Sequence, residues 1–169
     1  MESINLGISG DYGEAIYSVI GNWPGEYHSH AGYWCGDAFA VLDFRRYLKA
    51  LYKGDIRALN RAWKSLYHSF DELAPFLPEK APSQRARLEF ICWYRDSMTN
   101  YADFWLETAR EFFTNTEIYL CTGGDMAPEH GSDFSAQAKI AAKYGGGIRI
   151  TNEASSFPHN VRLTRLVSS

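Results

Sequence analysis

The 169-residue chain lacks the features that mark membrane, secreted and nucleic-acid-binding proteins. No stretch approaches the roughly 18 consecutive apolar residues of a membrane span. The N-terminal MESINLG has neither the basic nor the apolar region of a secretion signal. The net charge of -3 and the scattered basic residues give no electrostatic footprint for nucleic acid. We therefore expect neither a nucleic-acid nor a membrane partner.

Cysteine is scarce as well. Cys35, Cys92 and Cys121 lie far apart and form no Cys-x-x-Cys pair, so they predict neither a disulfide framework nor a zinc ribbon. His28 and His30 precede Cys35 at a spacing that is poor for zinc. We expect reduced thiols, a cytoplasmic location and no metal.

What the chain does have is enough apolar material for a core. With 46% hydrophobic and 22% charged residues it predicts one folded domain over 1–169. Aromatic residues make up 15% of the chain. Aromatic rings line ligand clefts, but they also fill the space between long helices and a sheet. We expect packing to account for most of the aromatic residues.

The most informative segment opens the chain. Apolar residues alternate from Ile4 to Ile8 on one face of a predicted strand, and a cluster of glycines then interrupts it. Asp11 and Glu14 follow, just past the C-terminal end of the strand. In parallel α/β proteins this is where catalytic side chains are placed, although Gly10 to Gly13 also reads as a simple turn.

The remaining pattern alternates helices with two more short strands. Asp37 and Asp55 predict N-caps for two helices, the second of which includes Leu66. Further elements are predicted as a helix over 83–113, a strand over 117–121, a helix over 133–144, a strand over 147–151 and a helical stretch over 160–167. The longest helix is predicted to bury one stripe, formed by Leu88, Ile91, Cys92, Met98, Tyr101, Trp105 and Thr108. This order indicates an α/β fold with about three parallel strands and a long helical insertion over 37–113.

Each predicted strand ends in a carboxylate or amide: Asp11 and Glu14, then Asp125, then Asn152 and Glu153. Parallel strands bring such ends to one edge of the sheet. Glycoside hydrolysis needs two carboxylates there, about 5 to 5.5 Å apart for retention or about 6.5 to 9.5 Å for inversion. Glu14 and Glu153 are the candidates for this pair. Either glutamate can instead be a carboxylate at the start of a helix, where it pairs with the helix dipole.

Two further signals have competing interpretations. Trp23 and Trp34 lie in the long loop over 11–36, where they can stack on a sugar or anchor the loop. The glycines at 123 and 124 suit a phosphate, but the lysine of a P-loop is missing. A phosphate-binding α/β protein is therefore the weaker hypothesis, and we expect no cofactor.

Five segments together resemble a known family. They are GDYG at 10–13, YWCGDAF at 33–39, LNRAW at 59–63, FDEL at 70–73 and WYR at 93–95. In this order they resemble the catalytic (β/α)₈ TIM barrel of family 42-type β-galactosidases, within the retaining glycoside hydrolase clan A. The resemblance implies that the chain covers roughly the fourth to sixth barrel strands.

The resemblance also implies roles for the candidate residues. The family's acid/base position aligns with Asp11. The GEAIY segment at 13–17, however, is similar to the residues around the acid of β-amylase-like barrels, which favours Glu14 as the acid/base. Both stay candidates. Tyr12, Trp23 and Trp34 are then stacking platforms, and Asp125, Asn152 and Glu153 hold sugar hydroxyls. The family's zinc cysteines are represented only by Cys35, so the resemblance implies no zinc site.

A complete barrel needs eight strands, and the family nucleophile would lie beyond residue 169. Unpaired strand edges in such a partial barrel predict self-association or a complementary barrel fragment as partner, besides a carbohydrate substrate. The alternative to an enzyme segment is a non-catalytic fragment or carbohydrate-binding half-barrel.

Overall fold

The computed structural model describes residues 2–10, 13–17, 32–123, 127–151, 158, 161–162 and 164–165. The chain divides into two compact units. One comprises Met1–Ala31 with Arg95–Ser169, and the other comprises Gly32–Tyr94. We call them unit 1 and unit 2. Whether they act as one domain stays a prediction.

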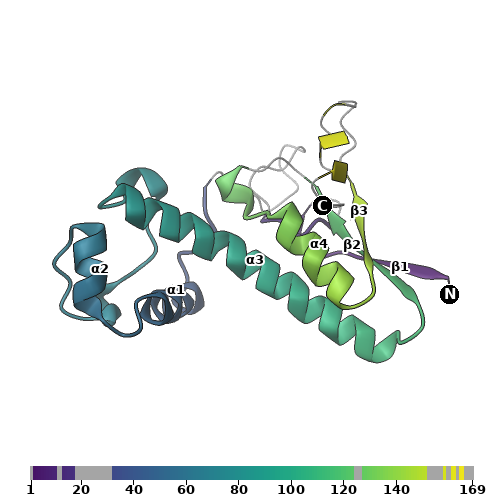
Figure 1. Cartoon of the computed structure of the whole chain (residues 1–169), viewed down its shortest axis with the longest axis horizontal. Helices are drawn as coiled ribbons and strands as arrows, with labels where there is room; N and C mark the ends of the chain where they lie inside the picture. The colour runs from purple at the N-terminus through teal and green to yellow at the C-terminus, as the bar shows by residue number, and fades with distance from the viewer. Residues whose placement is uncertain are drawn as a thin grey trace. The chain divides into compact units, whose positions relative to one another are not determined.

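Unit 1 contains a three-stranded parallel sheet in the order β1-β2-β3 (Figure 1). The strands are β1 (Ser3–Leu6), β2 (Glu117–Thr122) and β3 (Gly147–Ile150). Leu6 is paired with Leu120, which is paired in turn with Ile148. The predicted three parallel strands and the α/β class are confirmed.

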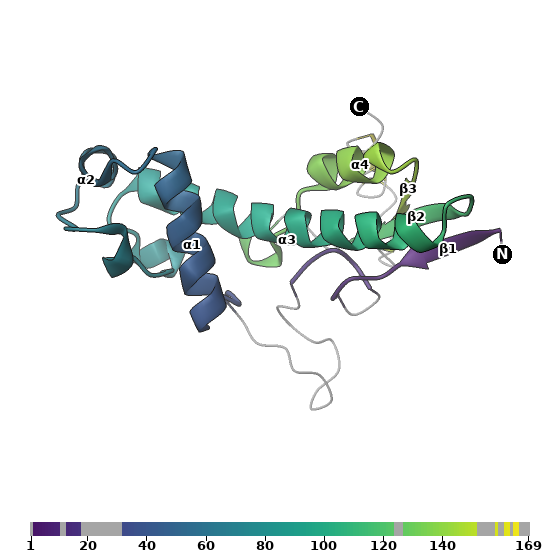
Figure 2. The same ribbon diagram turned by 90° about the horizontal axis from the view of Figure 1, so that it is seen from below.

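The helices of unit 1 cover one face of this sheet (Figures 1 and 2). They are α3 (Gln84–Phe112), of which the part from Arg95 belongs to unit 1, and α4 (Phe134–Lys143), preceded by the short η3 (Pro128–His130). The core joins Ile118 and Leu120 of β2 to small and apolar residues of the helices, namely Ala102, Leu106, Ala109 and Ala141. The register and the alternation of side chains place Asn5, Tyr119, Cys121 and Arg149 on the opposite face of the sheet.

Close packing in unit 1 depends on a glycine at the turn into β3. A Cβ on Gly146 would lie 3.3 Å from the carbonyl oxygen of Ala141 and still closer to that of Ile118. Asp133 begins α4 as its N-cap, and its carboxylate accepts from the Ala136 N–H. The predicted helix over 133–144 is therefore confirmed with its cap.

Unit 2 consists of helices around an aromatic core. It contains α1 (Ala38–Leu51), α2 (Ile56–Trp63), η1 (Phe70–Glu72), η2 (Pro78–Lys80) and the first part of α3. The ring of Phe44 lies 4.8 Å from that of Trp93 and 5.9 Å from that of Phe76, centroid to centroid. Asp37 and Asp55 cap α1 and α2 as predicted, each accepting two backbone N–H groups.

A buried carboxylate ties three helical segments of unit 2 together. Glu89 of α3 is 5% exposed and accepts from Trp63 Nε1 at 2.7 Å and from the Tyr52 hydroxyl at 2.8 Å. It also pairs with Arg85, one turn earlier on the helix. Burial, followed by the bond to Glu89, raises the pKa of Tyr52 to about 12.

Three details differ from the sequence predictions. The first strand ends at Leu6, and the N–H of Ile8 instead donates to Gly13 across a loop. Helix α2 ends at Trp63, because Lys64 is left-handed (φ 59°), which leaves Leu66 outside the helix and 91% exposed.

The third difference is the buried stripe of α3. Its fully buried positions are Ala86, Phe90, Tyr94, Met98, Ala102 and Leu106. Of the predicted stripe only Met98 is among them, whereas Tyr101 and Trp105 are 46% and 38% exposed. Where the helix packs on the sheet, the buried residues are Ala102, Leu106 and Ala109, and a search for the largest apolar residues overlooks the two alanines.

Four described residues of the predicted stretch 160–167, namely Val161, Arg162, Thr164 and Arg165, are helical. The three cysteines are free. Within the described part of the chain, no helix is long and apolar enough to cross a membrane.

Candidate functional site

The loop after β1 owes its shape to glycines. Gly13 has a positive φ of 81°, and a Cβ there would lie 2.9 Å from the Cα of Gly7. The two ends of the loop can approach this closely only without side chains. Gly13 donates to the Gly10 carbonyl at 2.9 Å, and Ile8 donates to the Gly13 carbonyl at 2.9 Å. The glycine cluster in the sequence thus encodes a tight loop that delivers the chain to Glu14.

Beyond this loop, residues 13–17 run past the C-terminal end of β2. The N–H of Ala15 donates to the Cys121 carbonyl at 3.0 Å, and that of Tyr17 donates to the His130 carbonyl at 2.9 Å. This anchoring brings Glu14 to the strand ends, and the side chain is only 4% exposed.

The Glu14 carboxylate contacts the residue that follows β3. The hydroxyl of Thr151 donates to Glu14 Oε1. The other oxygen lies against Gly10, where an added Cβ would also be 2.9 Å from Glu14 Cβ. Residues that follow the first and third strands therefore meet, as predicted for parallel strands. Glu14 supplies the carboxylate at this meeting point, and Thr151 supplies the hydroxyl.

Three further polar residues complete this group, which we call the strand-end cluster: Glu14, Thr122, Gln137 and Thr151. Thr151 donates its backbone N–H to the Thr122 carbonyl at 2.9 Å. The Thr122 hydroxyl bonds Gln137 Oε1, and Gln137 Nε2 donates to the Ala15 carbonyl at 2.7 Å. Thr122 and Gln137 are 1% and 0% exposed.

Sequence reasoning missed Thr122, Gln137 and Thr151. The available signal was a threonine at or just after the end of each later strand, where a hydroxyl can join neighbouring ends. Gln137 gave no comparable signal, because a glutamine within a helical pattern normally indicates an exposed face.

The charge of Glu14 influences its surroundings. Burial raises the pKa of the Cys121 thiol, and the Glu14 carboxylate raises it further, whereas Arg149 lowers it. Arg149 is the register partner of Cys121 in the neighbouring strand. Glu14 and Arg149 therefore act on the pKa of Cys121 in opposite directions.

Most of the other predicted site residues lie outside the described residues. These are Asp11, Tyr12, Trp23, Asp125, Asn152 and Glu153. Their roles, and the separation of the Glu14 and Glu153 carboxylates, stay predictions. Trp34 is described: it belongs to unit 2, is 38% exposed, and its backbone N–H donates to the Tyr94 hydroxyl at 3.0 Å.

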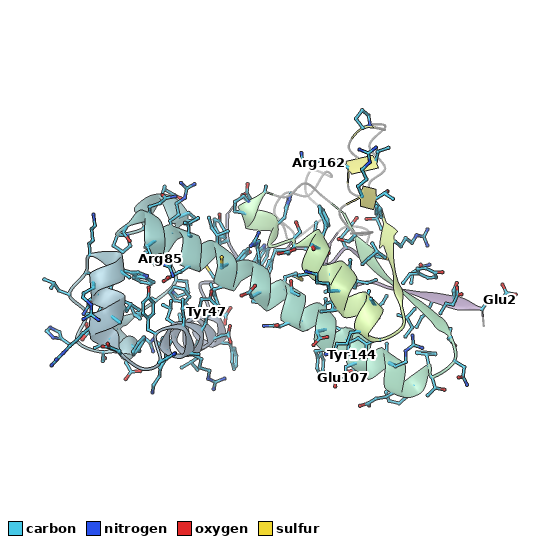
Figure 3. All side chains as sticks on the ribbon, in the orientation of Figure 1. Glu2, Tyr47, Arg85, Glu107, Tyr144 and Arg162 are labelled. Carbon is cyan, nitrogen blue, oxygen red and sulfur yellow. The ribbon has the colours of Figure 1, made fainter. Side chains whose placement is uncertain are left out.

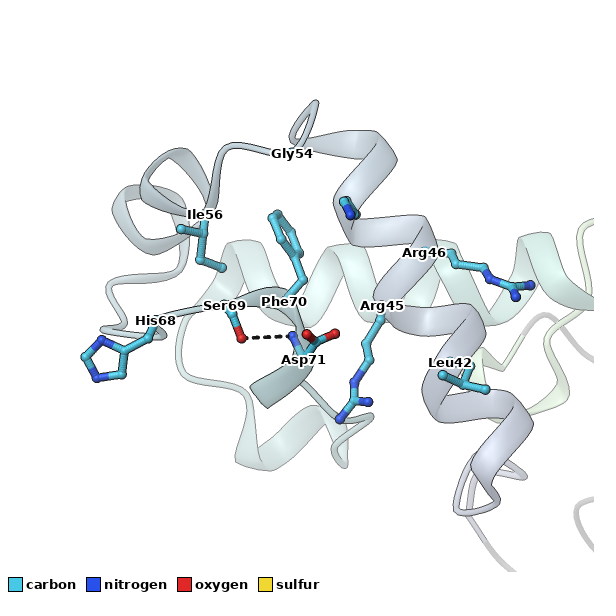
Figure 4. Close-up of a pocket in the computed structure, with 10 residues that line it drawn as sticks. Leu42, Arg45, Arg46, Gly54, Ile56, His68, Ser69, Phe70 and Asp71 are labelled. Carbon is cyan, nitrogen blue, oxygen red and sulfur yellow. Dashed lines mark hydrogen bonds between the residues drawn. The ribbon is translucent and has the colours of Figure 1, made fainter.

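Unit 2 contains a groove of about 460 Å³ that no sequence motif indicated (Figure 4). Helix α1 supplies one wall, and the segment around η1 supplies the other. Arg45 and Asp71 come from these two walls. The lining residues are Leu42, Arg45, Arg46, Lys49, Gly54, Ile56, His68, Ser69, Phe70 and Asp71. The groove belongs to unit 2, whereas the strand-end cluster belongs to unit 1.

The groups that could hold a metal are few. In the described ranges, no three or more His, Cys, Asp or Glu side chains gather into a metal-binding set.

What the strand-end cluster offers chemically is a single carboxylate with a hydroxyl donor, which suits proton transfer or a hydrogen bond to a ligand.

No protein-family model and no curated protein matches the chain. Among solved structures, one described as the structural analysis of an exo-beta-agarase is similar with a TM-score of 0.45 and 22% sequence identity. The match covers 74% of this chain and 16% of that chain.

Proposed function

We propose that the chain is a segment of a glycoside hydrolase of the β-galactosidase-like type, with the three strands forming part of a (β/α)₈ barrel. Glu14, or Asp11, is the acid/base that protonates the leaving oxygen of a β-galactoside-like carbohydrate. Asp125, Asn152 and Glu153 hold sugar hydroxyls. The nucleophile comes from a strand outside the described sheet.

The observation that carries this proposal is the place of Glu14. Its carboxylate lies at the C-terminal edge of a parallel sheet, the edge on which barrel enzymes place their chemistry. The Thr151 hydroxyl holds one oxygen, and the loop from Gly7 to Gly13 fixes the backbone. A general acid must be held in this way, since its proton has to reach one particular oxygen.

The sheet gives independent support for a barrel wall. Helices cover one face, and the other face carries Asn5, Tyr119 and Arg149. Parallel sheets are almost always covered on both faces, unless they close into a barrel with the second face inside.

A second candidate is a non-catalytic carbohydrate-binding fragment. It is favoured by the burial of Glu14, which is only 4% exposed and has one oxygen engaged by Thr151. A carboxylate held in this way also serves as a structural link between the ends of β1 and β3.

Because the proposed nucleophile lies on another strand, the test uses a complete barrel that contains this segment, and it compares β-galactosides that differ only in the leaving group. If Glu14 is the acid, Glu14→Gln lowers kcat/KM, which reports cleavage of the glycosidic bond, by about 10²- to 10⁴-fold for an alkyl β-galactoside. It lowers kcat/KM of the 2,4-dinitrophenyl β-galactoside far less, since that leaving group departs without a proton. Asp11→Asn is measured in parallel. If Asp11→Asn shows this difference between the substrates and Glu14→Gln does not, Asp11 is the acid.

Two controls separate catalysis from folding. Thr151→Val removes the hydroxyl but keeps the carboxylate, and Glu107→Gln changes an exposed glutamate (Figure 3). Equal loss on both substrates in Glu14→Gln contradicts the acid role. Saturable galactoside binding by calorimetry without turnover supports the fragment and contradicts the enzyme. If the protein shows no galactoside binding and no turnover, both the enzyme and the binding fragment are contradicted.

A further inference from the structure

The groove of unit 2 has one wall of cations and one wall of mixed chemistry (Figure 4). Arg45, Arg46 and Lys49 of α1 lie with Leu42 at helical spacing, so they share one face of that helix. Of the described residues that line the facing wall, Asp71 alone is acidic. With histidine neutral, the groove therefore carries three positive charges against one negative charge.

The carboxylates of unit 2 do not neutralise this wall of cations. The unit contains ten Lys and Arg residues against seven Asp and Glu residues. Asp43, the only acidic residue of α1, instead accepts from Trp93 Nε1 at 2.8 Å. In the part of the chain that the structure describes, neither Arg46 nor Lys49 forms an ion pair. Their charges are therefore available to an anion in the groove.

Arg45 presents a guanidinium that is already held in place. Its Nε donates to the Leu73 carbonyl at 2.8 Å. That bond leaves the two terminal nitrogens to serve as donors, in the fork that suits a phosphate or carboxylate group. Arg45 and Asp71 extend from opposite walls (Figure 4), but no ion pair joins these two described residues. An arginine fixed in this way loses less conformational entropy when an anion binds.

The facing wall suits hydroxyl groups better than a second anion. The Ser69 oxygen accepts from the Asp71 N–H at 3.3 Å (Figure 4). The serine hydrogen and the exposed Asp71 carboxylate remain for a ligand, the carboxylate as an acceptor of hydroxyl groups. Phe70 is 9% exposed and Ile56 is half-buried, and both give the groove apolar surface. The groove thus combines an anion site with a site for a neutral, hydroxylated body.

We propose that this groove binds a small sugar phosphate, with the phosphate on α1 and the hydroxyl groups on Ser69 and Asp71. A phosphate monoester carries about 1.5 to 2 negative charges at neutral pH, which three cations match better than the single charge of a sulfate ester. The groove of about 460 Å³ lies within the roughly 300 to 1,000 Å³ of small-molecule sites. The proposal does not rest on the proposed glycosidase activity, since each residue that it uses belongs to unit 2.

The experiment is isothermal titration calorimetry of the whole chain with glucose 6-phosphate and galactose 1-phosphate. It is done at about 0.1 M salt, where attraction between distant charges is screened. The double variant Arg46→Met, Lys49→Met removes two cations of the groove. We expect it to weaken sugar phosphate binding at least about tenfold, as for lost hydrogen bonds to a charged group. The matched control is Lys80→Met, Arg87→Met, which removes two exposed cations of unit 2 outside the groove and leaves binding unchanged.

The hydroxyl side of the groove is tested by Asp71→Asn, titrated with a sugar phosphate and with inorganic phosphate. We expect this variant to bind the sugar phosphate roughly three- to tenfold more weakly, the usual effect of losing one hydrogen bond. Inorganic phosphate has no sugar hydroxyl to lose, and the removed charge repelled it, so its binding does not weaken. Equal changes for the two ligands would contradict the sugar part of the proposal.

Far-ultraviolet circular dichroism and the urea midpoint verify that each variant folds. The absence of saturable binding of both sugar phosphates at about 1 mM overturns the proposal. So does binding that the Arg46 and Lys49 variant leaves unchanged, or that the control variant weakens equally. Glucose 6-sulfate bound as tightly as glucose 6-phosphate overturns the assignment to a phosphate. None of these readouts uses a β-galactoside substrate, so they fail independently of the glycosidase assay.

Discussion

The buried carboxylate of Glu89 provides the sharpest test of how unit 2 is held together. Glu89→Ala removes the acceptor of Trp63 Nε1, and the indole is 0% exposed, so water cannot replace it. Leaving one buried donor without a partner costs about 1 to 3 kcal/mol. Tyr52 and Arg85 are less enclosed and can turn to solvent, but each loses a bond to a charged group.

These contributions predict that Glu89→Ala lowers the free energy of unfolding by about 3 kcal/mol, most of it from the Trp63 N–H, since the pair with Arg85 contributes little when the arginine side chain is 60% exposed. Glu89→Gln keeps an oxygen for the Trp63 N–H but loses the charge that faces Arg85. Its expected cost is nearer 1 kcal/mol, the usual net value of a single hydrogen bond.

The assay is urea denaturation followed by circular dichroism and tryptophan fluorescence. The matched control is Glu107→Ala, a glutamate on the exposed side of the same helix, which we expect to stay within about 0.5 kcal/mol of wild type. Equal effects of Glu89→Ala and Glu107→Ala would refute the reasoning. So would a Glu89→Gln variant as unstable as Glu89→Ala, since the acceptor would then be irrelevant.

Two further predictions concern protons. Since folding raises the pKa of Tyr52 to about 12, from an unfolded value near 10, its contribution to stability is complete below pH 10 and is lost as pH rises toward 12. Urea midpoints at pH 9 and 11.5 should therefore fall less in Tyr52→Phe than in wild type, and identical falls would contradict the assignment. Burial, followed by a nearby carboxylate, raises the pKa of Cys35 to about 11, and burial raises that of Cys121. Iodoacetamide at pH 8 should modify the less buried Cys92 first, as read by peptide mass mapping, and earlier modification of Cys35 would contradict this.

Local signals in the sequence predicted the secondary structure well. Asp37, Asp55 and Asp133 each stand before an apolar helical pattern, and all three accept backbone N–H groups as caps. The three strands were readable because each is a short alternating run next to glycines. These features depend on neighbouring residues alone, so one sequence suffices to read them.

Contacts between distant segments were much harder to predict. The burial of Ala102 rather than Trp105 depends on how closely α3 approaches the sheet, and nothing near these residues in the sequence encodes that distance. The bond between Glu14 and Thr151 joins residues 137 positions apart. The parallel strand order predicted that these regions meet, but not which polar side chain would donate a hydrogen bond to the Glu14 carboxylate.

The structure also explains why the family resemblance supports a fold more directly than an activity. In the segment at 59–63, Leu59 and Trp63 are fully buried, and the Asn60 amide bonds both the N–H and the carbonyl of Tyr67. The segment at 70–73 buries Leu73, whose carbonyl accepts from Arg45.

These residues therefore pack, cap and close loops within unit 2, and a protein without glycosidase activity can need them for the same reasons. Under the proposed function, the residue that separates an enzyme from a folded fragment is Glu14, in unit 1, because a structural carboxylate and a proton donor differ in their response to the leaving group. A leaving-group effect in Glu14→Gln is consequently stronger evidence for a glycosidase than any number of matched residues in unit 2.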